Sequence, residues 1–152
     1  MDTSGAVPWS VRADYEEWVP PPATNPEGYV DPPARWMGVA TTLDVPATIT
    51  PGKVLEYVVT VRNVGDRSMD LTPCPGYFQE LTADPDLNEE PLVDAKWRLP
   101  CDDVGQLAPG DEQRFVMHLD VPAEVPGSEL SLRWELLDAW DTGAQAWLPV
   151  RD

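Results

Sequence analysis

The distribution of proline limits what this chain can fold into more than any other feature. Proline accounts for 18 of the 152 residues, against roughly 5% in an average protein. Its ring fixes φ and removes a backbone N–H, so proline interrupts helices and the interior strands of sheets. We therefore expect short strands joined by turns and no long helix.

The prolines also divide the chain into two parts. Seven of them lie between Pro8 and Pro33, which favours an extended, polyproline-like conformation. We assign residues 1–38 to a proline-rich N-terminal arm and residues 39–152 to a globular domain. The arm carries five aromatic side chains, which are uncommon in disordered linkers, and we expect them to bind a partner. They are Trp9, Tyr15, Trp18, Tyr29 and Trp36.

From Val39 onward, apolar and polar residues alternate with a period of two. The pattern is clearest in segments 39–45, 55–61, 115–121 and 130–136. Alternation of this kind is typical of strands that bury one face. Four weaker strands are predicted at 68–72, 77–81, 96–101 and 145–150.

Pro-Gly pairs recur between these segments, at 51–52, 75–76, 109–110 and 126–127. Turn signals at short spacing between alternating strands are typical of a sandwich. The prediction is an all-β fold, an immunoglobulin-like β-sandwich of 7–8 antiparallel strands, preceded by the arm.

The charge of the chain excludes several kinds of partner. Its net charge is −17, and such a surface repels nucleic acids and anionic lipid headgroups. No run of 18 apolar residues is present, so we expect no direct membrane insertion. The first residues lack the basic and apolar regions of a signal peptide. We therefore expect the chain to be cytosolic, to be a trimmed ectodomain, or to be carried outward by another route.

Two cysteines, Cys74 and Cys101, bear on this choice. Their spacing differs from the C-x-x-C of redox and zinc sites. We favour a disulfide between them, which points to an oxidising compartment. Two free thiols in a cytosolic protein are the alternative.

Residues for catalysis or metal binding are scarce. The single histidine, His118, is expected on the outward face of its strand, without convergent partners for a triad or a metal site. Residues 84–90 resemble the start of an EF-hand calcium loop, but Glu89 and Ala95 replace the required glycine and acid. We predict no catalytic residue, no metal site and no cofactor.

The tryptophans of the domain can either pack in the core or be exposed to bind a ligand. Trp134 is expected in the core, and Trp97 is a candidate to pack on a disulfide because it is near Cys101. Trp140 and Trp147 flank the last turn, where exposed rings could stack on a sugar. A carbohydrate- or calcium-binding module therefore remains an alternative function.

Several motifs suggest a family. They are the run Pro51–Gly65, Cys74-Pro75-Gly76-Tyr77, Leu99 with Cys101, Pro109-Gly110, Phe115–Leu119, Val121-Pro122-Ala123, and Leu132 with Trp134. With these residues the chain resembles, over about 39–137, the uncharacterised immunoglobulin-like domain of actinobacterial exported or membrane-anchored proteins. The resemblance implies a Cys74–Cys101 disulfide, an extracytoplasmic location and no known catalytic residue.

Together these features favour a non-enzymatic extracytoplasmic surface or assembly module. It would bind a protein partner or a neighbouring copy through the N-terminal arm, and oligomers are compatible with this. A structural subunit of a virion or filament is the second hypothesis.

Overall fold

The computed structural model describes residues 3–9, 38–71, 74–83, 91–101, 104–137 and 142–151. Within these residues the chain forms nine β-strands. They are β1 (Val39–Asp44), β2 (Val54–Asn63), β3 (Met69–Asp70), β4 (Gly76–Thr82), β5 (Val93–Arg98), β6 (Gln106–Leu107), β7 (Glu112–Asp120), β8 (Glu129–Leu136) and β9 (Ala144–Pro149). In this described part, no helix has the length and apolarity needed to cross a membrane.

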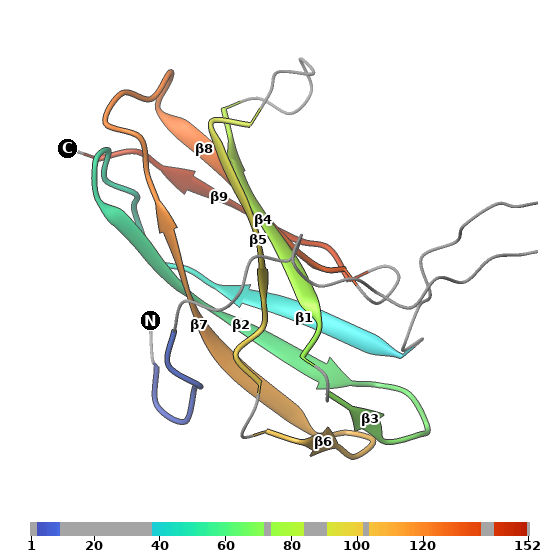
Figure 1. The fold of residues 1–152 in the computed structure, drawn as a ribbon. Coiled ribbons are helices and arrows are strands. Elements are labelled where there is room, and N and C mark those ends of the chain that lie inside the picture. The colour runs from blue at the N-terminus through green and yellow to red at the C-terminus, as the bar shows by residue number, and fades with distance from the viewer. Residues whose placement is uncertain are drawn as a thin grey trace, which may run out of the picture.

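The strands form two antiparallel layers, which are seen crossing each other in Figure 1. One sheet has the order β1-β2-β7, and the other has the order β5-β4-β8-β9. The short strands β3 and β6 pair separately at one end. The fold is thus the predicted all-β, immunoglobulin-like sandwich. Its described residues form nine strands rather than seven or eight, because the two-residue strand β6 was not predicted, whereas β3 lies within the predicted segment 68–72.

The inward faces of the two sheets form one hydrophobic core. The alternation predicted for the four clearest strands agrees with the burial, since Leu55, Phe115 and Leu132 are all nearly inaccessible. Trp134 is fully buried, as expected, and stacks on Tyr77 with ring centroids 5.6 Å apart. Large aromatic side chains of this kind supply much of the buried apolar area of a small sandwich.

Two features of the strands differ from the sequence-based expectation. The predicted strand at 96–101 lies instead at Val93–Arg98, because Leu99 and Pro100 follow the last ladder pair. In addition, Val58 and Val116 face each other on the outer side of their sheet and are both buried. The centre of β2 and β7 is therefore buried on both faces, whereas alternation predicted burial on one.

Three edges of the sandwich are partly closed by backbone or side-chain contacts. Ile49 forms a parallel bridge with Val150, directly after β9, and its N–H donates to the carbonyl of Pro149 at 2.9 Å. The hydroxyl of Thr41 on β1 donates to the carbonyl of Thr142, just before β9. The edge of β7 is occupied by residues from the N-terminus, which are described below. An edge with paired groups does not attract other strands.

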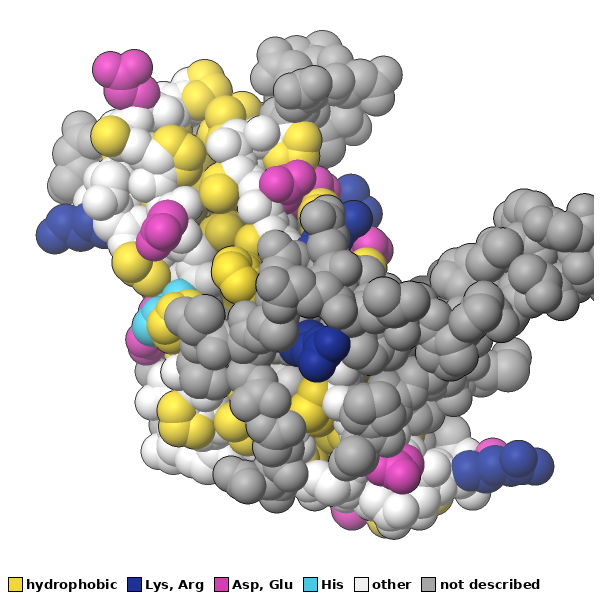
Figure 2. All heavy atoms as spheres, in the orientation of Figure 1, with side chains coloured by type: hydrophobic (Ala, Val, Ile, Leu, Met, Phe, Trp, Pro, Cys, Tyr) yellow, Lys and Arg dark blue, Asp and Glu magenta, His cyan; other side chains and the backbone are white. Residues whose placement is uncertain are grey.

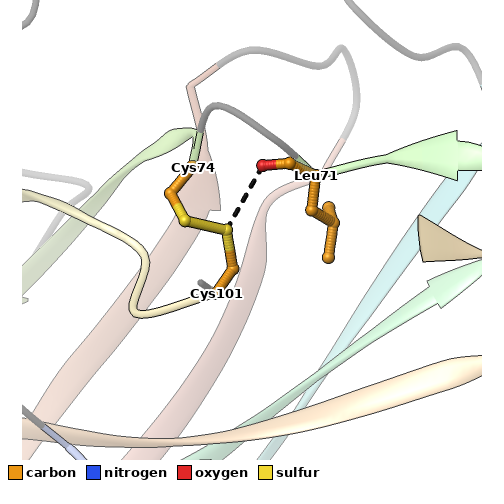
Figure 3. Close-up of a disulfide and its surroundings, with 3 residues drawn as sticks. All are labelled: Leu71, Cys74 and Cys101. Carbon is orange, nitrogen blue, oxygen red and sulfur yellow. Dashed lines mark hydrogen bonds between the residues drawn. A yellow bond between two sulfur atoms is a disulfide. The ribbon is translucent and has the colours of Figure 1, made fainter. Parts of the chain in front are cut away.

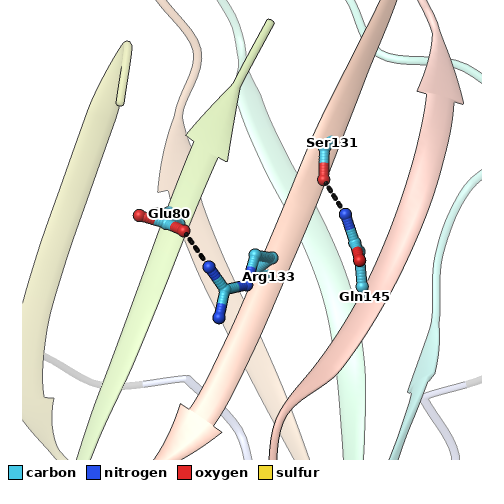
Figure 4. Close-up of polar contacts among 4 residues, drawn as sticks. All are labelled: Glu80, Ser131, Arg133 and Gln145. Atoms are coloured by element: carbon cyan, nitrogen blue, oxygen red, sulfur yellow. Dashed lines mark hydrogen bonds and ion pairs between the residues drawn. The ribbon is translucent and has the colours of Figure 1, made fainter. Parts of the chain in front are cut away.

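The outer face of the four-stranded sheet carries polar pairs (Figure 4). Arg133 on β8 donates to Glu80 on β4 at 3.0 Å, and Gln145 on β9 donates to Ser131 on β8 at 2.6 Å. The half-exposed guanidinium of Arg133 pairs with a mostly buried carboxylate. These cross-strand pairs make the outer face polar, with the exposed Arg133 and Gln145 bonded to the buried Glu80 and Ser131.

Cys74 and Cys101 form a disulfide, in agreement with the pairing that the sequence favoured. Their Cα atoms are 5.6 Å apart, and the bridge links the start of β4 to the segment after β5. The Sγ of Cys101 lies 3.3 Å from the carbonyl oxygen of Leu71 (Figure 3). The bridge therefore ties the start of β4 to the end of β5, at one end of this strand pair and next to the core.

Candidate functional site

Residues 3–9, which we call the N-terminal segment, lie along the open edge of β7 (Figure 1). Val7 forms a parallel bridge with Phe115. Its N–H donates to the carbonyl of Arg114 at 2.8 Å, and its carbonyl accepts from the N–H of Val116 at 2.9 Å. The segment thus adds one bridged residue, Val7, to the edge of the three-stranded sheet, where these backbone groups would otherwise be exposed.

Side chains of β7 hold the segment ahead of this bridge. The guanidinium of Arg114 donates to the carbonyl of Ser4 at 2.7 Å, and the amide of Gln113 donates to the carbonyl of Gly5 at 3.4 Å. The N–H of Ala6 closes a turn onto the carbonyl of Thr3 at 3.1 Å. Gly5 has φ of 73°, a left-handed conformation that glycine adopts without strain. The turn directs the chain onto the β7 edge.

Trp9 ends the segment with an aromatic contact. Its ring stacks on the imidazole of His118, with centroids 4.5 Å apart and planes 15° apart. The Nε2 atom of His118 lies 2.9 Å from a carboxylate oxygen of Glu56 on the neighbouring strand β2. His118 lies on the outward face as predicted, but its ring is held between an indole and a carboxylate.

Gln79 links the two sheets directly behind this stack. Its side chain is almost inaccessible, and its Oε1 accepts a hydrogen bond from the Tyr57 hydroxyl at 2.5 Å. Its Nε2 donates to the backbone carbonyl of His118 at 2.9 Å. Burial raises the pKa of Tyr57 well above its ordinary value, and the nearby Tyr77 raises it further. Tyr57 therefore stays a neutral donor, which the acceptor on Gln79 requires.

A groove of about 410 Å³ opens between β7 and β5, the adjacent edges of the two sheets. Its lining residues include Trp9, Trp97, the exposed Val54, Asp94, Asp120 and His118. The floor contains Gln79. In the space-filling view, hydrophobic side chains gather beside the histidine, with acidic side chains scattered around them (Figure 2).

Only part of the predicted partner-binding set can be placed. Trp9 is exposed by 37% and lines the groove. The other four aromatic residues of the arm lie outside the described residues, so their role stays a prediction. They are Tyr15, Trp18, Tyr29 and Trp36.

The sites considered for sugar or calcium are described only in part. Trp147 is exposed by 47%, whereas Trp140 and the loop 84–90 lie outside the described residues. Among the residues that are described, no three acidic, histidine or cysteine side chains are grouped to hold a metal. Trp97, considered as a disulfide neighbour, lies opposite Tyr77 in the β4–β5 ladder and lines the groove.

Sequence reasoning missed three residues that build this region: Arg114, Val116 and Gln79. A signal was present for two of them. Gln79 occupies an inward position between Tyr77 and Leu81, and a polar side chain there requires a buried partner. Val116 belongs to an unbroken apolar run with its neighbours, and such runs indicate burial on both faces. Nothing in the sequence indicates that Arg114 binds the backbone of Ser4.

Comparisons with known proteins are limited to structural similarity. No protein-family model matches the chain, and no curated protein matches it. The chain is similar to Spo0M, the sporulation control protein from Bacillus subtilis, with a TM-score of 0.52 and 14% identity. The match covers 76% of this chain and 50% of Spo0M, so the chain spans half the length of that protein.

A second similar structure is the CARDB domain of PF1109 from Pyrococcus furiosus. Its TM-score is 0.47 at 14% identity, and the match covers 74% of this chain and 94% of that domain. At these identities the likeness to Spo0M concerns the fold alone. The site must therefore be interpreted from its own geometry.

Proposed function

We propose that this chain is a non-enzymatic extracytoplasmic module that binds a protein partner at the β7 edge and through its N-terminal arm. The strand addition of Val7 to β7 is the observation that supports this proposal most directly. Extended peptides that add to a sheet edge gain affinity from main-chain hydrogen bonds and specificity from the side chains beside them.

The edge of β7 presents outward-facing backbone groups in a fixed order. The carbonyl of Arg114 and the N–H of Val116 bond to the N-terminal segment, and the carbonyl of His118 bonds to Gln79. The first two groups are available to any extended segment that replaces residues 3–9. Since the pairing is through the backbone, that segment can come from a partner or from a second copy of the chain.

The disulfide supports the extracytoplasmic part of the proposal. A buried bridge between Cys74 and Cys101 persists in oxidising compartments and is rare in the cytosol. The non-enzymatic part is supported by His118, because its ring is stacked on Trp9 and contacts Glu56. Trp9 covers one face of the ring and Glu56 takes its Nε2 atom, which leaves less of the imidazole open to a substrate.

A second candidate function is a structural subunit that assembles by exchange of the segment between copies. The contact of Val7 with β7 favours this function as well, because a segment that docks within one chain can dock identically on a neighbouring copy. In that case the full chain would form oligomers at high concentration, measurable by sedimentation, and a chain lacking residues 1–9 would remain monomeric.

Peptide complementation tests the proposed function. A chain lacking residues 1–9 is titrated with a synthetic peptide covering residues 3–9, and binding is followed by fluorescence anisotropy. We expect saturable binding to the truncated chain and much weaker binding to the full chain, whose edge is occupied.

A peptide carrying Val7→Pro is the matched control. Proline lacks the N–H that donates to Arg114, so this peptide should bind far more weakly. Equal binding of both peptides, or no binding of either to the truncated chain, would refute a strand-accepting edge.

A further inference from the structure

The N-terminal segment contacts both faces of the three-stranded sheet within three residues. Val7 forms its bridge with the core-facing Phe115 and packs against the hydrophobic core. Trp9 stacks instead on His118, which lies on the outward face of β7. In a regular strand, side chains two positions apart point to the same face. The segment therefore leaves the strand conformation between Val7 and Trp9, where Pro8 lies.

The properties of Pro8 explain this change of face. Proline fixes φ and favours the polyproline II conformation, which has three residues per turn. It also keeps the preceding residue extended, as the backbone pairing of Val7 requires. Pro8 is exposed, and because the N–H and the carbonyl of Val7 both bond to β7, the nitrogen of Pro8 is directed away from that edge. The missing N–H therefore costs no bond to β7 and offers no donor to a further strand.

The imidazole of His118 is a fixed platform for the aromatic side chain. Its Nε2 atom lies 2.9 Å from a carboxylate oxygen of Glu56, and its backbone carbonyl accepts from Gln79. Both contacts come from the sandwich itself, so they persist when the N-terminal segment is replaced. The indole of Trp9 covers one ring face but is still exposed by 37%. The platform therefore recognises a flat ring rather than the full outline of an indole.

We propose that the β7 edge selects partner segments with the pattern aliphatic–proline–aromatic, which residues 7–9 represent. The proposal rests on the proposed function, because it names the kind of segment that the strand-accepting edge binds. The aliphatic residue pairs through its backbone with Arg114 and Val116, the proline changes the face, and the aromatic ring stacks on His118.

A protein of different sequence is a better source of this pattern than a second copy of the chain. Among the 18 prolines of the sequence, Pro8 alone is followed by an aromatic residue. A second copy can thus offer the pattern only after its own segment has left its own β7 edge. A partner's segment requires only that the edge of the accepting chain opens.

The test uses the full chain carrying Val7→Pro, whose own segment lacks the N–H that donates to Arg114. The amide of Val116 should exchange at least about tenfold faster in this variant than in the unsubstituted chain. The peptide acetyl-Ser-Gly-Ala-Val-Pro-Trp-amide reproduces residues 4–9. We expect it to restore the protection, with a dissociation constant on the order of 1 mM or lower.

Substituted peptides test the pattern. Pro8→Ala should weaken binding at least about threefold, and a peptide with Ala6 and Pro8 exchanged, which keeps the composition, should bind no better. Trp9→Leu should weaken binding at least about fivefold, whereas Trp9→Tyr should stay within about twofold. Adding His118→Ala to the protein should remove the difference between the original peptide and Trp9→Leu, and His118→Phe should retain it because a phenyl ring is also flat.

Equal binding of all these peptides would overturn the pattern and leave the strand-accepting edge standing. Protection that no peptide restores, or a Val116 amide that stays slow in the Val7→Pro chain, would overturn both. Self-association of the unsubstituted chain in sedimentation experiments, if Trp9→Leu abolishes it, would overturn the partner in favour of a second copy. Failure of the pattern and failure of the proposed function are therefore distinguishable.

Discussion

The indole of Trp9 lies almost parallel to the imidazole of His118, with ring centroids 4.5 Å apart. This contact joins residues from the N-terminal segment and from β7, and it lies two residues beyond the Val7 bridge. The aromatic stack and the backbone pairing therefore both attach the N-terminal segment to β7. Such aromatic pairs contribute about 0.5–1.5 kcal/mol beyond the area that they bury.

The first prediction concerns this stack. His118→Ala should lower the free energy of opening of the N-terminal segment by about 1 kcal/mol, because the ring contact is lost. Amide hydrogen exchange of Val7 reports this opening. Glu56→Gln is the matched control, since it keeps the stack and removes only the carboxylate charge. Unchanged exchange of Val7 in His118→Ala would show that the stack does not hold the segment.

The second prediction concerns the hydrogen bond between Tyr57 and Gln79. Tyr57→Phe leaves a buried amide oxygen without its donor, and Gln79→Leu leaves a buried hydroxyl without its acceptor. Each substitution should lower the free energy of unfolding by about 1–3 kcal/mol. The double variant should lose less than the sum of the two, by at least about 0.5 kcal/mol. Urea unfolding of the four proteins measures this, and strict additivity would argue against the pair.

The third prediction concerns the disulfide. Cys74→Ser with Cys101→Ser should lower the free energy of unfolding by about 3–4 kcal/mol in the chain-entropy model, given a separation of 27 residues. Treatment of the native protein with a reductant should reproduce the loss in a denaturant titration. If reduced and oxidised chains unfold at the same midpoint, the bridge does not stabilise the fold and its support for an oxidising compartment is lost.

The fourth prediction concerns alkaline stability. Burial raises the pKa of Tyr77 well above the ordinary value of about 10, and Tyr57 is raised in the same direction. The native state therefore retains protons that the unfolded chain releases above about pH 10. The contribution of these two tyrosines to the free energy of unfolding is fully present below that pH. It falls as the pH rises above it, by about 1.4 kcal/mol per pH unit for each tyrosine.

Tyr77→Phe isolates one of these two groups. The variant should lose stability above pH 10 with a slope that is smaller by about 1.4 kcal/mol per pH unit. Urea unfolding of both proteins between about pH 8 and pH 11 brackets the pH at which tyrosine titrates. The measurement at pH 8 is the internal control for the packing effect of the substitution. Parallel curves for the two proteins would contradict a raised pKa at Tyr77.

Much of the fold could be predicted because its determinants are local. Alternation in segments such as 55–61 and 130–136 placed inward residues correctly. The Pro-Gly pairs at 51–52, 109–110 and 126–127 marked turns or bends, whereas the predicted turn at 75–76 was wrong because Gly76 is the first residue of β4. The buried outer positions Val58 and Val116 were missed because a period of two describes a strand with one solvated face. Their burial depends on what packs over the sheet, which local periodicity does not report.

The groove could not be predicted for a related reason. Trp97 and Asp94 belong to β5, whereas Asp120 belongs to β7, and the two strands are edges of different sheets. Their proximity is set by how the sheets stack, and strand order is not encoded in the alternation of a single strand. Trp9 was recognisable as a docking residue from its place in the arm, but its partner His118 was not.

The fifth prediction tests the central claim, that β7 has a strand-accepting edge occupied by residues 3–9. The amide of Val116 donates to the carbonyl of Val7, whereas the core amides of β7 donate within the sheet. Amide exchange of Val116 should accelerate at least about tenfold when residues 1–9 are removed, and added peptide 3–9 should restore its protection. Exchange that stays equally slow without residues 1–9 would contradict the claim.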